Sequence, residues 1–185
     1  MTSKQSNNSN TVEVDGIQFE TLMPERVFVI PASQQDVSIP VQLGIRITNN
    51  TPTAVRFCFY SAMTPELMMP DGQIRRQGSY FSDWLEGPRA SDFPTVLPGE
   101  AVTFFPSASY RYEGNQFQFT ISVGNGGYWV FEKLQLGSYQ IRFNYKNNAA
   151  QVRAYDLESG RNKLIENIWT GVVLMPFIEF SVLNP

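Results

Sequence analysis

Carboxylates are the residues of this chain that could most directly support catalysis, because two of them can act as acid and base on a glycoside. Several are expected in loops where two could converge, namely Asp83, Glu86, Asp92, Glu100 and Glu113. Their spacing selects no pair, and a domain of this size seldom offers the long cleft that glycosidases need. No phosphate-binding glycine loop leads from a strand into a helix. We therefore expect a protein that is not an enzyme.

Histidine is absent from the 185 residues. Without imidazole the chain cannot form Ser-His-Asp or Cys-His sites, or histidine-containing zinc sites. Cys58 is the only cysteine and lies in an apolar run, so we expect a buried strand residue rather than a reactive thiol. Asp156 and Glu158 lie among alternating charges, where a solvated hairpin is favoured over a calcium site. No cofactor and no metal site are expected.

Two segments rich in aromatic residues or glycine are candidate partner-binding sites. The first contains residue types that dominate binding hot spots, and its members are Tyr80, Phe81, Trp84 and Arg89. A loop that covers an open end of the core is the alternative for this segment. The second comprises Gly124, Asn125, Gly126, Gly127, Tyr128 and Trp129. For its glycines a hairpin turn with positive φ is the alternative.

A third set of aromatic residues offers a different function. Tyr110 and Tyr112 share one side of an extended stretch and, with Trp129, could stack on sugar rings. The two tyrosines could equally pair across strands. Carbohydrate binding is thus one alternative to protein binding. A structural subunit of a larger assembly, joined through an exposed sheet edge, is another.

Charge and hydropathy limit the partners and the location of the protein. The formal net charge is −3, with no basic face for duplex nucleic acid. Residues 1–10 are polar and low in complexity, so residues 1–12 are expected to be a disordered tail and residues 13–185 one domain. We expect a cytoplasmic protein, because no secretory signal and no apolar stretch of about 18 residues is present.

Period-two alternation of apolar and polar residues predicts an all-β chain, with turns at glycine, proline, asparagine and aspartate. Residues 41–47 alternate clearly, and the turn at 49–52 leads to Val55, Phe57 and Phe59, which predicts a hairpin. Further strands are expected at 17–22, 27–30, 66–69, 73–76, 101–105, 117–121, 128–131, 139–145, 169–173 and 177–183.

The segment from Leu134 to Tyr145 indicates the kind of β fold. Its Leu-x-x-Gly-x-Tyr sequence, ending at Tyr139, has the form of a tyrosine corner, in which the phenol hydroxyl bonds to backbone a few residues upstream. The strand that follows alternates strictly between apolar and polar residues. We therefore predict a single immunoglobulin-like antiparallel β-sandwich, with a closed barrel as the alternative.

The order of the turn motifs resembles that of BsuPI-like intracellular proteinase inhibitors. The motifs span residues 48–57, 69–73, 97–104 and 134–139, and the similar region covers about residues 41 to 145. The stretch from Trp169 to the end resembles the last strands of bacterial immunoglobulin-like modules. The resemblance implies an immunoglobulin-like fold and, less directly, binding of a protease.

A second inhibitor family shares one loop with this chain. The Gly124 to Gly127 sequence matches the Gly-x-Gly-Gly loop of chagasin-like inhibitors of papain-type cysteine proteases. The arginine-proline-aromatic motif of that family is missing, and Asn50 to Thr53 is a distorted version of its third loop. Together the observations predict a non-catalytic protein-interaction module, with proteinase inhibition as its most specific form.

Overall fold

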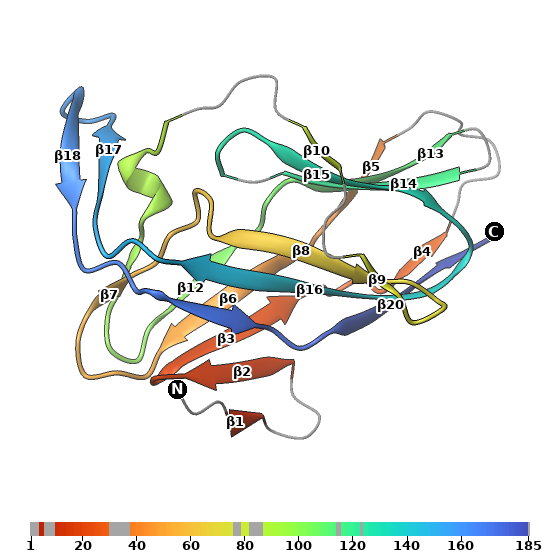
Figure 1. Ribbon diagram of the computed structural model, residues 1–185, viewed down its shortest axis with the longest axis horizontal. Helices are drawn as coiled ribbons and strands as arrows, with labels where there is room; N and C mark the ends of the chain where they lie inside the picture. The colour runs from red at the N-terminus through yellow and green to blue at the C-terminus, as the bar shows by residue number, and fades with distance from the viewer. Residues whose placement is uncertain are drawn as a thin grey trace.

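The computed structural model describes residues 4–5, 10–29, 38–75, 79–81, 87–113, 116–122 and 124–184, without the side chains of 4–5, 79–81 and 112–113. These residues form strands in several open sheets, as the alternation predicted, and they contain no α-helix. One short 3-10 turn, η1 (Ala90–Asp92), interrupts the strands. The expected all-β class is confirmed (Figure 1).

The first sheet contains five antiparallel strands, in the order β1 (Lys4–Gln5), β2 (Thr11–Val14), β3 (Ile17–Leu22), β6 (Gly44–Asn49) and β12 (Ala101–Phe104). Alternate residues of β3 are buried, since Ile17, Phe19 and Thr21 face the core. The buried Val12 of β2 lies before the expected start of the domain at residue 13, so folded structure begins inside the segment expected to be a tail.

The second sheet also contains five antiparallel strands, in the order β10 (Ser79–Phe81), β15 (Tyr128–Leu134), β14 (Gln116–Ser122), β13 (Ala108–Glu113) and β5 (Ser38–Val41). It continues the first sheet, because β5 leads into β6 and β12 leads into β13. The β6–β12 pair of the first sheet and the β5–β13 pair of the second sheet have the same register, so the pairing continues across the break between the sheets. At the break a side chain on Gly44 would collide with the Phe104 carbonyl, and Pro106 has no N–H to donate.

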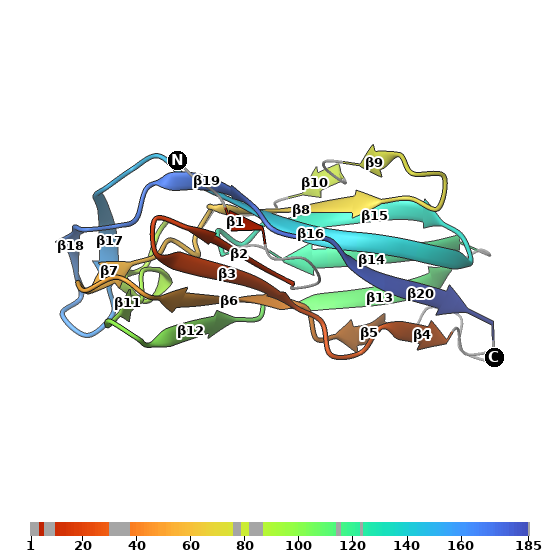
Figure 2. The same ribbon diagram turned by 90° about the horizontal axis from the view of Figure 1, so that it is seen from below.

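The third sheet packs against both of these sheets. Its order is β4 (Val27–Val29), β20 (Ile178–Leu183), β16 (Gly137–Asn147), β8 (Met63–Met68) and β9 (Ile74–Arg75), and β19 (Gly171–Leu174) also pairs with β16. Only the pairing of β20 with β4 is parallel among these strands. Figure 2 shows β8 and β16 in one layer and β3, β6 and β12 in the other.

Aromatic rings fill the space between the layers. Phe19 of the first sheet lies 5.5 Å from Tyr145 of the third, measured between ring centroids. Phe119 of the second sheet lies 6.1 Å from Phe180 of the third, which also stacks on Tyr139 at 5.5 Å. The third sheet therefore shares one core with both other sheets.

The tyrosine corner is present as the sequence predicted. The Tyr139 hydroxyl donates to the Gln135 carbonyl at 2.7 Å and accepts from the Gln135 N–H at 2.8 Å. The Tyr139 side chain is buried, and its burial raises the pKa of the phenol. The corner thereby anchors the start of β16 to the segment before it.

The predicted hairpin between residues 41–47 and 55–59 is wrong. Strand β6 pairs with β3 and β12, whereas β7 (Val55–Arg56) pairs with β11 (Thr95–Val96) in a separate small sheet. The buried Asn49 explains the exit from the first sheet, because its amide donates to the Thr53 and Val96 carbonyls at 2.8 and 2.9 Å. A side chain thus satisfies backbone groups that a hairpin ladder would have used.

A second small sheet lies at the same end of the molecule as β7 and β11 (Figure 2). It consists of β17 (Val152–Asp156) and β18 (Arg161–Ile165), which form an antiparallel hairpin. Tyr155 of β17 bridges to Arg89 beside η1. The described residues therefore form more than the two sheets of the predicted sandwich.

Candidate functional site

The first predicted binding segment is only partly described. Trp84 lies outside the described residues, and for Tyr80 and Phe81 only the backbone in β10 is described. That backbone pairs with the second predicted segment, since Tyr80 lies opposite Trp129 and Phe81 opposite Tyr128. Arg89 lies apart from this ladder, where its N–H donates to the Asp92 carboxylate at 2.7 Å. The structure thus brings four of the ten predicted residues together on neighbouring strands, namely Tyr80, Phe81, Tyr128 and Trp129.

The glycines of the second segment form the turn between β14 and β15. Gly124 lies against the backbone of Phe59 and Tyr60, and the Asn125 side chain accepts the Gly127 N–H at 3.0 Å. Of the four residues Gly124 to Gly127, only Gly126 has a positive φ, of 83°. Close packing and turn geometry therefore explain these residues without a ligand.

Tyr110 is unavailable for stacking on a sugar. Its ring is buried between Phe28 and Phe117, with centroid distances of 5.2 and 5.1 Å. Its hydroxyl donates to the Val29 carbonyl at 3.3 Å, and burial raises the pKa of the phenol. The side chain of Tyr112 lies outside the described residues, and Trp129 is half-buried. The cross-strand alternative fits Tyr110.

The candidate carboxylates do not converge in the part of the chain that the structure describes. The Asp92 carboxylate accepts the N–H of Arg89, and the Glu100 carboxylate accepts the N–H of Leu97 at 3.4 Å, so each bonds within its own turn. Asp83, Glu86 and the Glu113 side chain lie outside the described part. No cluster of three or more possible metal ligands occurs among the described residues.

The remaining candidate chemical groups also have structural partners. Asp156 accepts from Ser159 at 2.7 Å and pairs with Lys163 at 3.0 Å, and these contacts lower the pKa of its carboxyl. Cys58 is buried, and its N–H donates to the Tyr145 hydroxyl at 2.9 Å. Burial raises the pKa of that tyrosine. These contacts account for both sites as parts of the fold.

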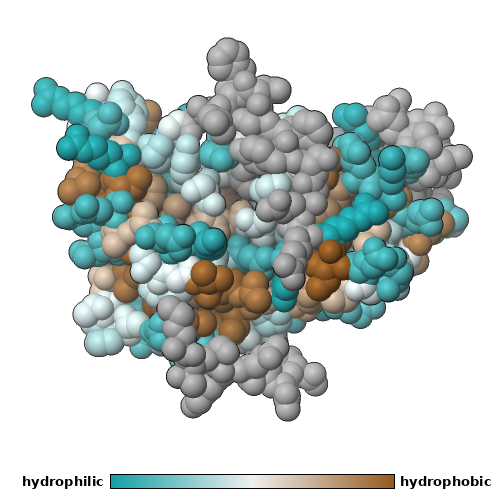
Figure 3. All heavy atoms as spheres, in the orientation of Figure 1, coloured by the Kyte–Doolittle hydropathy of each residue, from teal (hydrophilic) through white to brown (hydrophobic). Residues whose placement is uncertain are grey.

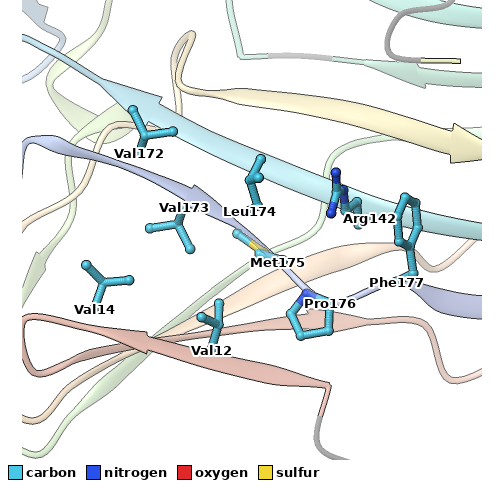
Figure 4. A pocket seen from close by; sticks show the side chains of 9 residues that line it. All are labelled: Val12, Val14, Arg142, Val172, Val173, Leu174, Met175, Pro176 and Phe177. Carbon is cyan, nitrogen blue, oxygen red and sulfur yellow. The ribbon is translucent and has the colours of Figure 1, made fainter. Parts of the chain in front are cut away.

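A groove that the sequence analysis did not identify lies between β2 and β19. Its volume is about 480 Å³, within the range typical of ligand sites. Val12 and Val14 point from β2 toward β19 across it (Figure 4). Eight of its nine lining residues are apolar, and the complete set is Val12, Val14, Arg142, Val172, Val173, Leu174, Met175, Pro176 and Phe177. Figure 3 shows hydrophobic residues gathered on this part of the surface.

An extra residue between β19 and β20 shapes the groove. Leu174 pairs with Asn144, but the next pair along β16 joins Ile178 to Ile141, so one residue is inserted opposite β16. Such a bulge changes which side chains face outward. Met175 and Ile178 are buried, while Pro176 and Phe177 are partly exposed beside Arg142.

The edge of β19 that faces away from β16 has no strand partner among the described residues. The Met175 N–H donates to the Phe143 carbonyl on β16 at 3.2 Å. Because hydrogen-bonding residues alternate along an antiparallel pair, the N–H and C=O groups of Val172 and Leu174 point away from β16. Their side chains are 52% and 56% exposed. Backbone and side chains of β19 are thus both available to a ligand.

Arg142 is the only charged residue that lines the groove within the described chain. Its Nε and Nη2 approach the same Glu66 carboxylate oxygen, at 2.7 and 2.6 Å. Its guanidinium carbon lies 4.3 Å from the centroid of the Phe177 ring. Ion pair and ring together fix the guanidinium at one end of the groove.

The sequence contained a weak signal for this groove. The run from Val172 to Phe177 is apolar and broken by a proline, which favours an edge or bulged strand. The contributions of Val12 and Arg142 depend on tertiary pairing, which no local pattern reports.

Comparison with protein-family models, with curated proteins and with solved structures gives no match for this chain. The resemblance to BsuPI-like inhibitors stays a prediction. In the described part of the chain, no helix has the length and apolar character needed to span a membrane.

Proposed function

We propose that this chain is a non-catalytic protein-interaction module that binds an extended segment of another protein as an added strand along β19. The proposal keeps the predicted class of function and moves the site from the aromatic loops to the β2–β19 groove. A protein segment offers both backbone groups and side chains, which are the two features that β19 presents.

The fold that we propose with this function is an immunoglobulin-like β-sandwich whose first and second sheets form one bent layer. The continuous register from β5 to β6 and from β12 to β13 supports this interpretation, as does the tyrosine corner at Tyr139. Rigid layers on both sides would hold the groove open in a fixed shape.

The uncharged edge of β19, which has no strand partner among the described residues, is the observation that carries the proposal. Natural proteins usually protect an edge strand by making it short, charged or covered. The edge strand β9 follows this rule, because it has two residues and one of them is Arg75. Strand β19 has four residues without a charge, and two of its hydrophobic side chains are exposed. An added strand would satisfy the outward backbone groups of β19 and cover those side chains.

Proteinase inhibition is the narrower form of the proposal, in which the segment bound at β19 belongs to a protease. Carbohydrate binding has less support, because Tyr110 packs in the core. A role as a subunit of an assembly agrees with the proposal where a different protein of that assembly supplies the segment bound at β19.

Replacement of Leu174 by proline tests strand addition directly. The Leu174 N–H faces away from β16, so Leu174→Pro removes a donor from the free edge and leaves the pairing with β16 intact. Leu174→Thr is the matched control, since it keeps the N–H and shortens the side chain. Peptides selected from a displayed library of linear peptides on the original protein are then measured against both variants.

We expect Leu174→Pro to weaken these peptides about tenfold or more, and Leu174→Thr to weaken them less, because only the proline removes a backbone bond. Thermal unfolding of both variants verifies that the fold is retained. Equal binding to Leu174→Pro and the original protein would contradict strand addition at β19. Selection of no β19-dependent peptide would contradict it as well.

A further inference from the structure

We infer that the segment bound at β19 carries a carboxylate side chain that pairs with Arg142, two strand positions before an apolar residue. This inference rests on the proposed function and specifies the chemistry of its ligand. It follows from the position of Arg142 at one end of an otherwise apolar groove.

The register of β16 with β19 sets the spacing of the ligand. Lys146 lies opposite Val172 and Asn144 opposite Leu174, so these side chains share the outer face of the third sheet. Arg142 is the next residue of β16 on that face, and it lies beside Pro176 where pairing with β19 has ended. Side chains of an added strand recur on one face at every second residue. Its residues opposite Val172, Leu174 and Pro176 therefore lie on the same face as Arg142.

Arg142 retains hydrogen-bonding capacity for a ligand. Both of its contacts with Glu66 go to a single carboxylate oxygen and use Nε and Nη2. No partner for Nη1 occurs among the described residues. A guanidinium has donors on all three nitrogens and favours planar carboxylate groups. Glu66 is buried and does not line the groove, so the cation is the charge that a ligand meets.

The pattern of the ligand follows from these positions. A strand added antiparallel to β19 meets Pro176 first, then Leu174, then Val172. Its sequence would place aspartate or glutamate first, an apolar residue two positions later and another two positions after that. The residues between them would face Val12 and Val14 of β2, where small or β-branched apolar side chains fit.

Two matched peptides of about seven residues test this inference. Both have blocked ends, one polar residue at the second position, valine at the fourth and sixth positions, and alanine at the third and fifth. One carries glutamate at the second position and the other carries glutamine. Dissociation constants come from titrations followed through the amide resonances of Val172 and Leu174.

We expect the glutamate peptide to bind about fivefold more tightly than the glutamine peptide, with a smaller ratio in high salt. In the double variant E66Q/R142Q the ratio should fall to about one. Both charges are removed together there, because Arg142→Gln alone would leave the buried Glu66 without its counter-ion. Thermal unfolding of the variant verifies its fold, and the comparison of peptides on the original protein does not depend on it.

The outcomes separate this inference from the proposal on which it rests. Equal binding of the two peptides to the original protein would overturn the carboxylate inference and leave strand addition standing. If neither peptide shifts the β19 resonances, the carboxylate inference and strand addition at β19 are both overturned. Binding of decanoate in place of either peptide would overturn them in favour of a lipid. A peptide-free dimer joined at β19 would assign the edge to a second copy of the chain.

Discussion

At the scale of single residues, Tyr139 makes the clearest test of what stabilises the fold. Its hydroxyl both donates to and accepts from the backbone of Gln135. Tyr139→Phe keeps the buried ring and removes both bonds, so we expect the free energy of unfolding to fall by about 1–2 kcal/mol. Chemical denaturation measures this loss as a lower midpoint with an unchanged slope.

Tyr155→Phe is the control for this substitution. Tyr155 is 43% exposed on β17, and we expect its replacement to change the free energy of unfolding by less than about 0.5 kcal/mol. A similar small effect at Tyr139 would show that the corner is dispensable for stability.

At the scale of elements, the turn between β14 and β15 depends on close packing at Gly124. A Cβ on this residue would collide with the Phe59 carbonyl and lie 2.9 Å from the Tyr60 Cα. Both obstacles are backbone atoms, so the turn itself must shift. We expect Gly124→Ala to lower the free energy of unfolding by about 1–3 kcal/mol, measured by chemical denaturation.

Gly87→Ala provides the matched control, because no heavy atom of the described residues lies within 4 Å of the position its Cβ would occupy. We expect it to be neutral to within about 0.5 kcal/mol. If Gly124→Ala left the free energy of unfolding unchanged but weakened binding of a partner, the turn would be assigned as a binding loop instead.

Strand positions and the local hairpin around Asp156 could be predicted from the sequence, but pairing between distant strands could not. Alternation at residues 17–22 predicted β3 with its bounds, because burial of one face imposes a local period of two. The same logic failed at residues 49–59. There the outcome depends on the hydrogen bond from the Asn49 amide to the carbonyl of Val96, a residue that is distant in sequence. The β2–β19 groove escaped prediction for the same reason, since its two walls lie near opposite ends of the chain.

At the scale of the whole molecule, consecutive strands join the first and second sheets, and all three large sheets share one core. The chain crosses between the first and second sheets at β5–β6 and at β12–β13, and the β6–β12 and β5–β13 pairs keep the same register. The third sheet contributes Tyr145 and Phe180, which contact Phe19 of the first sheet and Phe119 of the second. Unfolding of either the first or the second sheet would therefore expose the apolar face of the third sheet.

This sharing predicts a single cooperative unfolding transition. Trp169 packs 5.4 Å from Phe19 near the first sheet, and Trp129 lies in β15 of the second, so the two residues report on different halves. With 5-fluorotryptophan incorporated, we expect the native ¹⁹F resonances of both to disappear at the same urea concentration. The midpoint from far-UV circular dichroism should coincide with theirs. Separate midpoints would mean that the part around the first sheet, reported by Trp169, and the part around the second sheet, reported by Trp129, unfold independently. The β2–β19 groove lies between strands of the first and third sheets, so it would then persist only while the part around Trp169 stays folded.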